Sequence, residues 1–195
     1  LKALPDEPNS IRRERTQMTE EMLDLIRKRR TIRRFTEEDV SEEQVDTLVE
    51  MAMCAPNRLN GQPWHFVVIR DKELQKQIAD TYQVRPYVEQ APVVIAIGAN
   101  PAESATWMMD ISAAAENLLL AATAMGLGGA WFGAPGTVFS DQTEELVREA
   151  LGIPAHIRIP IMLAIGHPAV EPPPHGKHDR FVRTKVHYGK WGELK

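Results

Sequence analysis

Positive charge gathers in one short stretch of this chain, Arg-Arg-Thr-Ile-Arg-Arg at residues 29–34. A guanidinium group presents a rigid fork of donors that matches the oxygens of a phosphate in pairs, and the hydroxyl of Thr31 adds another donor. In an extended segment, Thr31, Arg33 and Phe35 would lie on one face. The stretch therefore indicates an anion site, although such a cluster taken alone is more often the solvated end of a helix.

A second segment with chemical potential is the loop PNRLNGQPW at residues 56–64. The side-chain amides of Asn57, Asn60 and Gln62 both donate and accept hydrogen bonds, which suits a flat heterocycle edged with carbonyl and N–H groups. Asparagine and glycine are also common in plain turns, so the loop alone is compatible with a structural role.

A third segment is GLGGAWFG at residues 126–133. Its glycines allow the backbone to lie close against a ligand, and Trp131 offers a flat aromatic face. The alternative is the end of a helix followed by a loop with a core tryptophan. Together the three segments would supply a phosphate clamp, a polar edge and a close backbone approach.

Other chemistries find little support. The histidines form no HxxxH or HExxH pair on a helix, and neither a GxSxG nor a GxxxxGK[ST] motif occurs. The single cysteine, Cys54, can form no internal disulfide, and we expect it to be a small buried side chain. The net charge of −4 argues against a general nucleic-acid binder. An enzyme of this composition would depend on a bound cofactor.

Hydrophobic periodicity predicts an α+β chain. The predicted helices cover residues 20–29, 42–53, 72–82, 103–126 and 142–151, and the predicted strands cover residues 64–70, 92–99 and 157–166. Ser41 with Gln44, and Asp141 with Glu144, have the spacing of helix-capping boxes. Pro160 removes a donor, which places its strand at a sheet edge or at a bulge. The tail EPPPHGKHDR is expected to be extended.

The order and spacing of these segments resemble the nitroreductase family of FMN-dependent enzymes. The motifs are RRTIRRF, APNRLNGQPWHF, the long helix leading into GLGGAWFG, and AIGHP followed by basic residues, across about residues 20–190. The resemblance implies a central antiparallel sheet flanked by helices, with an extended C-terminal tail exchanged in a homodimer. FMN would lie at the dimer interface and contact both subunits.

The resemblance also assigns roles to the arginine cluster. Arg29, Arg30, Thr31 and Arg33 fall on the family's N-terminal flavin motif, where Arg29 would hold the phosphate and Arg33 would lie near the pyrimidine side of the ring. A fixed cation there would stabilise the negative charge that the flavin gains on reduction.

The remaining cofactor residues follow in the same order along the chain. Asn60 would hydrogen-bond the flavin ring, with Asn57 and Gln62 as neighbours, although Asn57 replaces the serine usual at that place. Trp131 and Gly133 match the segment whose backbone faces N5 and O4 of the flavin.

The C-terminal tail would return to the phosphate through Lys177 or Arg180. Its KHDR spacing departs from the family's Lys-x-Arg, which favours Arg180. We expect residues 1–18 to be a poorly ordered extension and residues 19–195 to form a single FMN-binding domain in a cytoplasmic protein with no metal.

The implied activity passes a hydride from NADH or NADPH through the flavin to a nitroaromatic, a quinone or a similar acceptor, without an acidic or basic side chain in the hydride step. The alternatives are a flavin-binding sensor or storage protein, a specialised relative such as a reductive dehalogenase, and a nucleic-acid or protein interaction module that uses the basic patch 27–34.

Overall fold

The computed structural model describes residues 9–83, 86–133 and 135–194. The chain divides into two compact units, of which the larger spans Arg29–Pro172. The smaller unit comprises the N-terminal helix and the tail from Pro173 onwards. All but two of the predicted site residues belong to the larger unit.

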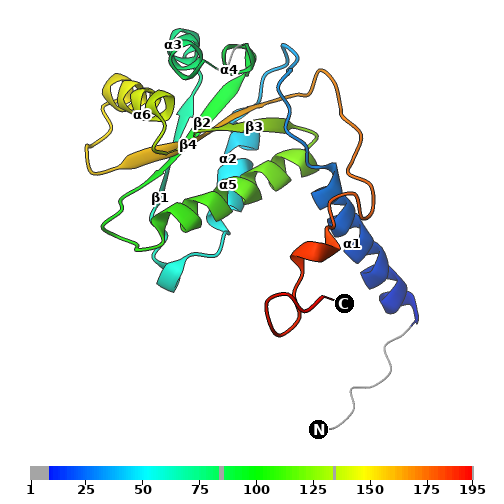
Figure 1. The fold of residues 1–195 in the computed structure, drawn as a ribbon. Coiled ribbons are helices and arrows are strands. Elements are labelled where there is room, and N and C mark those ends of the chain that lie inside the picture. The colour runs from blue at the N-terminus through cyan, green and yellow to red at the C-terminus, as the bar shows by residue number, and fades with distance from the viewer. Residues whose placement is uncertain (1–8, 84–85, 134, 195) are drawn as a thin grey trace. The chain divides into compact units, whose positions relative to one another are not determined.

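The larger unit is built on an antiparallel sheet with the strand order β1-β2-β4-β3 (Figure 1). The strands are β1 (Trp64–Ile69), β2 (Val93–Ala99), β3 (Gly128–Phe132) and β4 (Arg158–Gly166). Every residue of β2 is buried, because the strand lies in the interior of the sheet and helices cover both faces. A run of valine, isoleucine and alanine, interrupted only by Gly98, suits this position. The predicted α+β class and antiparallel sheet are confirmed.

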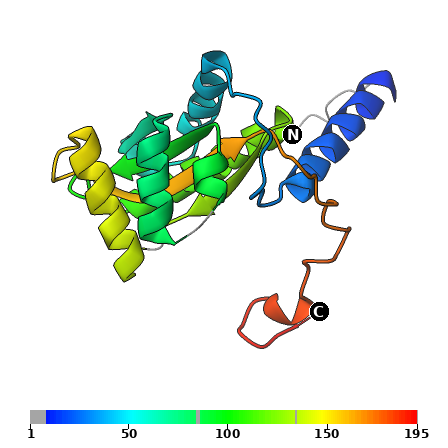
Figure 2. The ribbon, with the colours of Figure 1, turned by 90° about the horizontal axis from the view of Figure 1, so that it is seen from above.

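Helices cover the two faces of the sheet (Figures 1 and 2). One face carries α2 (Glu42–Met53) and α5 (Trp107–Ala124), and the other carries α3 (Lys72–Tyr82), α4 (Tyr87–Gln90) and α6 (Val138–Leu151). The side chains of β2 alternate between the two: Ile95 and Ile97 pack with α5, whereas Val94 and Ala96 pack with the α3–α4–α6 layer. This alternation follows from the two-residue repeat of a strand.

The bulge that Pro160 allowed is present in β4. Between Ile161 and Arg158, two residues of β4 face a single residue of β2. Because of the extra residue, Ile159 packs with the α3–α4–α6 layer while Ile161 packs with α5, although an unbroken strand would place both on one face. The alternative of an edge position is wrong, since β4 pairs with β2 on one side and β3 on the other.

The smaller unit consists of α1 (Asn9–Lys28), the tail and the short helix η2 (Arg183–Lys185). The helix predicted at residues 20–29 is the second half of α1, which begins at Asn9 within the stretch 1–18; residues 1–8 of that stretch lie outside the described residues. The amide of His175 donates to the carbonyl of Arg27 at 3.0 Å and ties the tail to the last turn of α1.

Local sequence signals succeeded at one predicted cap and failed at the other. The capping box at the start of α2 is confirmed: Ser41 Oγ accepts from the Gln44 amide, and the Gln44 side chain accepts from the Ser41 amide. The capping box at Asp141 and Glu144 is wrong, because α6 begins at Val138, three residues before Asp141. Cys54 was also misplaced: it ends α2 in an exposed position.

Candidate functional site

The arginine segment runs extended along the edge strand β3. Thr31 forms a parallel bridge with Gly129, and the Ile32 amide donates to the Gly129 carbonyl at 2.9 Å. Ile32 is buried against Gly128, where an added Cβ would lie 2.3 Å from Ile32 Cγ1. Glycine at this position is what lets the segment approach β3 so closely. The segment is therefore not a solvated helix end, since α1 stops at Lys28.

The cationic side chains of the segment point to different neighbours. Arg29 Nε lies 3.3 Å from a carboxylate oxygen of Glu116 on α5. The guanidinium of Arg33 lies 5.9 Å from the ring centre of Tyr87 on α4. Burial raises the pKa of the Tyr87 phenol, and the charge of Arg33 together with its hydrogen bond opposes that rise. The segment thus presents cations toward both helical layers.

The other members of the cluster are less tightly defined. Arg30 is half-buried, whereas Thr31 and Arg34 are exposed. The Arg34 carbonyl accepts from the Ala169 amide at 2.9 Å, which ties the segment to the residues that follow β4. Phe35 is half-buried against the same core as Tyr87, so Arg33 and Phe35 share a face as the alternation predicted.

The loop between α2 and β1 brings the three predicted amides together. The Gln62 amide donates to Asn57 Oδ1 at 2.9 Å, and Gln62 Nε2 lies 3.4 Å from Asn60 Oδ1. Asn60 and Gln62 are exposed, with side chains that reach solvent. The short helix η1 (Arg58–Asn60) forms the turn of the loop. The arrangement leaves donors and acceptors directed outward from a compact turn.

The backbone of this loop is strained. Leu59, Asn60 and Gln62 have φ values of 53°, 54° and 48°, in the left-handed region that side-chain-bearing residues rarely occupy. Each such residue costs on the order of 1 kcal/mol or more, and strain of this kind collects at ligand-binding sites. The amide of Arg58 donates to Asp110 on α5 at 3.3 Å, so the loop is fastened to the same helix that Arg29 contacts.

The predicted residues on β3 lie at its far end. Trp131 is half-buried on the α5 side of the sheet. Gly133 has φ +109°, and a Cβ there would lie 2.1 Å from the Pro160 carbonyl oxygen beside the bulge of β4. Only glycine fits this contact, so Gly133 is what lets the backbone at the end of β3 lie against β4.

The arginine segment and the amide loop approach different sides of α5. Their contacts on the helix, Glu116 and Asp110, are separated by six positions. At about 1.5 Å and 100° per residue, six positions correspond to about 9 Å along the axis and to sides about 120° apart. The arginine segment and the amide loop therefore both contact α5, but within one chain they do not converge on a single point.

Lys177 and Arg180 belong to the smaller unit. Both are exposed, in a turn where the Gly176 amide donates to Asp179 Oδ2 at 2.6 Å. This turn gives the tail a defined local form. The assignment of Lys177 or Arg180 to a phosphate stays a prediction.

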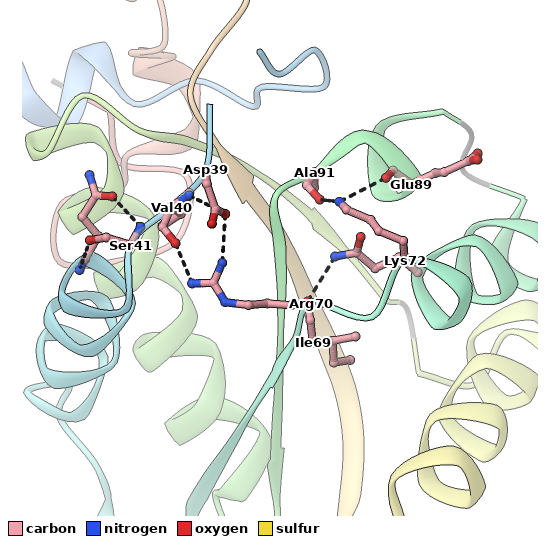
Figure 3. A network of polar contacts seen from close by, with 10 residues as sticks. Asp39, Val40, Ser41, Ile69, Arg70, Lys72, Glu89 and Ala91 are labelled. Atoms are coloured by element: carbon pink, nitrogen blue, oxygen red, sulfur yellow. Dashed lines mark hydrogen bonds and ion pairs between the residues drawn. The ribbon is translucent and has the colours of Figure 1, made fainter. Parts of the chain in front are cut away.

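A cavity of about 720 Å³ adjoins the arginine segment, with Arg34, Phe35, Asp39, Lys72 and Glu89 in its lining. Charged side chains fix its walls, as Figure 3 shows. Arg70 donates to Asp39 Oδ1 at 3.0 Å, and Lys72 Nζ donates to the backbone carbonyl of Ala91. Burial lowers the pKa of Lys72, against an opposing effect of the Asp39 charge.

The described residues contain no group of three or more histidine, cysteine, aspartate or glutamate side chains that could hold a metal ion. No helix in this part of the chain is long and apolar enough to cross a membrane.

Two acidic residues on α5 escaped the sequence reasoning. The sequence predicts a helix at residues 103–126 but assigns no role to Asp110 or Glu116. A signal was available in Asp110, which is a lone acid in the first turn, four and six positions after Thr106 and Ser104. Short hydroxyl residues at such spacing can hydrogen-bond a carboxylate.

The fold and the site define a class of protein: an α+β domain in which an arginine segment on a sheet edge and an amide-rich loop flank one central helix. The model of the nitroreductase family matches residues 26–86 and 83–167. The chain belongs to the nitroreductase family, as the sequence motifs predicted.

Individual relatives agree with the family match. A protein of Archaeoglobus fulgidus, provisionally named NADH dehydrogenase/NAD(P)H nitroreductase, is 35% identical over 88% of this chain and 99% of its own length. The crystal structure of an FMN-dependent nitroreductase from Clostridium difficile has a TM-score of 0.79 at 26% identity and covers 86% of this chain and 99% of its own. An iodotyrosine deiodinase of Thermotoga neapolitana is 25% identical over 83% of this chain and 96% of its own length. These names agree with the predicted enzyme class, an NAD(P)H-dependent flavin oxidoreductase, and with FMN as the predicted cofactor.

Proposed function

We propose that this chain holds FMN and passes a hydride from NADH or NADPH to a nitroaromatic, a quinone or a similar acceptor. The observation that carries the proposal is the strained loop with its outward amides, fixed on the same helix as the arginine segment. When bound, FMN supplies the hydride chemistry. The protein's own residues bind, orient and shield it.

The arginine segment provides the anionic end of this site. Arg29 holds the phosphate, with Arg30 and Thr31 beside it, and Arg33 stabilises negative charge at the pyrimidine side of the ring. Arg29 Nε lies 3.3 Å from a carboxylate oxygen of Glu116, so this guanidinium already pairs with an anionic oxygen, and its side chain is 26% exposed. A phosphate would compete with Glu116 for the same guanidinium.

The loop and the end of β3 provide the ring contacts. Asn60 bonds the ring edge, and Asn57 and Gln62 fix the shape of the loop around it. The backbone between Trp131 and Gly133 faces N5 and O4, and Gly133 lets the chain pack closely against the Pro160 carbonyl at this end of β3. The basic tail reaches the phosphate through Arg180 or Lys177.

A second copy of the chain completes the site. Because the arginine segment and the loop approach α5 from sides about 120° apart, one flavin meets both more readily when two chains each supply one group. α5 also offers an exposed apolar side chain for such pairing, since Met109 is 74% exposed. A homodimer is the arrangement that fits both observations.

The first experiment is an absorbance spectrum of the purified protein, followed by anaerobic addition of NADH and then NADPH. A yellow protein that bleaches with a reduced nucleotide and regains colour with nitrobenzoate or benzoquinone supports the proposal. A colourless protein that FMN does not reconstitute overturns the cofactor assignment. If a reduced nucleotide bleaches the protein but neither acceptor restores its colour, the assignment of FMN as cofactor stands and the proposed acceptor class is overturned.

Arg29→Ala is a sharper test of the phosphate role. Loss of a charge-assisted phosphate contact should weaken FMN binding about 10- to 100-fold, measured by quenching of flavin fluorescence. Arg34→Ala is the matched control, since Arg34 is exposed and its one assigned contact uses the backbone carbonyl. Equal affinities of the two variants would contradict the role of Arg29.

A second candidate function is reductive dehalogenation, favoured by the relative named as an iodotyrosine deiodinase. Adding iodotyrosine to the panel of acceptors separates the two functions. Release of iodide at the expense of NAD(P)H, without turnover of nitroaromatics or quinones, would favour the dehalogenase.

A further inference from the structure

A buried acid on α5 holds the strained loop in place. Asp110 is 4% exposed and lies in the first turn of α5. It accepts hydrogen bonds from Ser104 Oγ at 2.6 Å, from Thr106 Oγ1 at 3.1 Å and from the Arg58 amide at 3.3 Å. The two hydroxyls come from residues just before α5 and orient the carboxylate, and the third bond crosses to the loop.

The two ends of the strained turn are pinned by different residues. Asp110 accepts from the amide of Arg58 at its start, and Asn57 Oδ1 accepts from the amide of Gln62 at its end. Between these points, Leu59 is 87% exposed and gains no core packing that could offset its left-handed backbone. The hydrogen bonds at its two ends, together with the bond from the Gly61 amide to the Arg58 carbonyl within it, therefore stabilise the turn.

A carboxylate is well suited to this task. Its two oxygens accept several bonds at once, so it can serve the hydroxyls of residues 104 and 106 and the loop amide together. Hydrogen bonds to a charged acceptor are also stronger than bonds between neutral groups. Removal of the carboxylate would leave the Arg58 amide without this acceptor and free the start of the turn.

We propose that Asp110 is the positioning residue that holds the turn of residues 58–62 in the conformation that presents Asn60 and Gln62 to the flavin ring. This inference rests on the proposed function, because it assumes that the loop contacts flavin. Asp110 itself acts only through Arg58, since it lies beneath the turn and is shielded from solvent.

The decisive variant is Asp110→Ala, with Glu144→Ala as its control. Both remove a carboxylate that belongs to a 4%-exposed residue, but Glu144 lies on α6 and bonds to β4 and not to the loop. We expect Asp110→Ala to weaken FMN binding to the deflavinated full chain about 10- to 100-fold, because small displacements of positioning groups have effects of this size. Glu144→Ala should bind FMN within about threefold of wild type.

Hydrogen exchange provides a readout that does not depend on flavin. The amides of residues 58–62 should exchange at least about tenfold faster in Asp110→Ala than in wild type, while the Glu144→Ala loop keeps its protection. Asp110→Asn, which keeps an acceptor oxygen for the Arg58 amide, should restore most of the protection and of the affinity. If Asp110→Ala does not fold, Ser104→Ala, which removes the 2.6 Å bond, should show both changes in weaker form.

The outcomes separate this inference from the proposed function. Wild-type affinity in Asp110→Ala, or an equal loss of affinity in Glu144→Ala, overturns the positioning role. Unchanged exchange of the loop in Asp110→Ala also overturns it. Failure of wild type to bind FMN overturns the proposed function, and exchange would then test the anchoring of the turn alone.

Discussion

Two buried carboxylates, one on each helical layer, are held in contrasting ways. Asp110 on α5 and Glu144 on α6 are each 4% exposed. Asp110 accepts from two hydroxyls and a backbone amide. Glu144 accepts from Arg158 through Nε at 2.7 Å and through a terminal nitrogen at 2.9 Å, and also from Arg148 and the Ile159 amide.

The different partners of the two carboxylates indicate different roles, structural for Glu144 and, as proposed, functional for Asp110. Glu144 neutralises two arginines and fixes the Ile159 amide next to the bulge of β4, so its partners belong to the framework. Asp110 instead accepts a hydrogen bond from the Arg58 amide, which belongs to an exposed turn whose side chains face solvent. Equal burial therefore gives one carboxylate a role in sheet geometry and the other a role in presenting a loop.

The largest effect on stability should come from Glu144→Ala. Its removal leaves two guanidinium groups without their shared partner, which destabilises by about 3 kcal/mol once the partial exposure of Arg158 is taken into account. Urea unfolding measures this loss. An equally large loss of unfolding free energy in Asp110→Ala would contradict the contrast between the two carboxylates. The donors to Asp110 are neutral, and leaving them unpaired should cost only about 1–2 kcal/mol.

A smaller effect should come from Ser41→Ala, which removes the cap of α2 on the same face of the sheet as the loop. The expected loss is about 1 kcal/mol in the free energy of unfolding, with FMN affinity unchanged. Thermal and urea unfolding with a flavin titration test both parts. A drop in affinity like that of Asp110→Ala would show that the loop responds to any weakening of this layer.

The smallest effect concerns acid pH. Burial on its own raises the pKa of Glu144, but hydrogen bonds from Arg158 and the Ile159 amide, with the charges of Arg158 and Arg148, outweigh it and hold the pKa below 4.5. A lowered pKa in the folded state gives stability that is present above about 4.5 and lost as the pH falls through the lower folded value. Urea unfolding between pH 7 and 3 should show a shallower decline in Glu144→Gln than in wild type; parallel declines would contradict the assignment.

Much of the framework followed from local patterns. The helix predicted at residues 72–82 coincides with α3, and the strand predicted at 92–99 differs from β2 by one residue. The box of Ser41 and Gln44 formed because both partners lie within one turn. Each of these features depends on neighbours close in sequence, so periodicity and capping rules were sufficient.

The failures share a dependence on distant partners. β3 begins with two glycines, which disfavour strands, and it forms because β4 supplies its hydrogen bonds. Glu144 has the spacing of a cap residue, yet Arg158 and Ile159, fourteen and fifteen positions later, give it stronger contacts. The residues predicted to contact flavin are grouped in short segments, so the sequence alone allows their prediction, whereas Asp110 contacts its loop across 52 positions.

The arginine segment also has a consequence for solubility. β3 is an edge strand, and unpaired edges invite further strands from other chains. The bridge at Thr31 and Gly129 and the bond from Ile32 occupy part of that edge with the chain's own backbone. The segment whose arginines are proposed to bind an anion thus also covers the sheet edge with its backbone, so a change that releases the segment from β3 should promote aggregation.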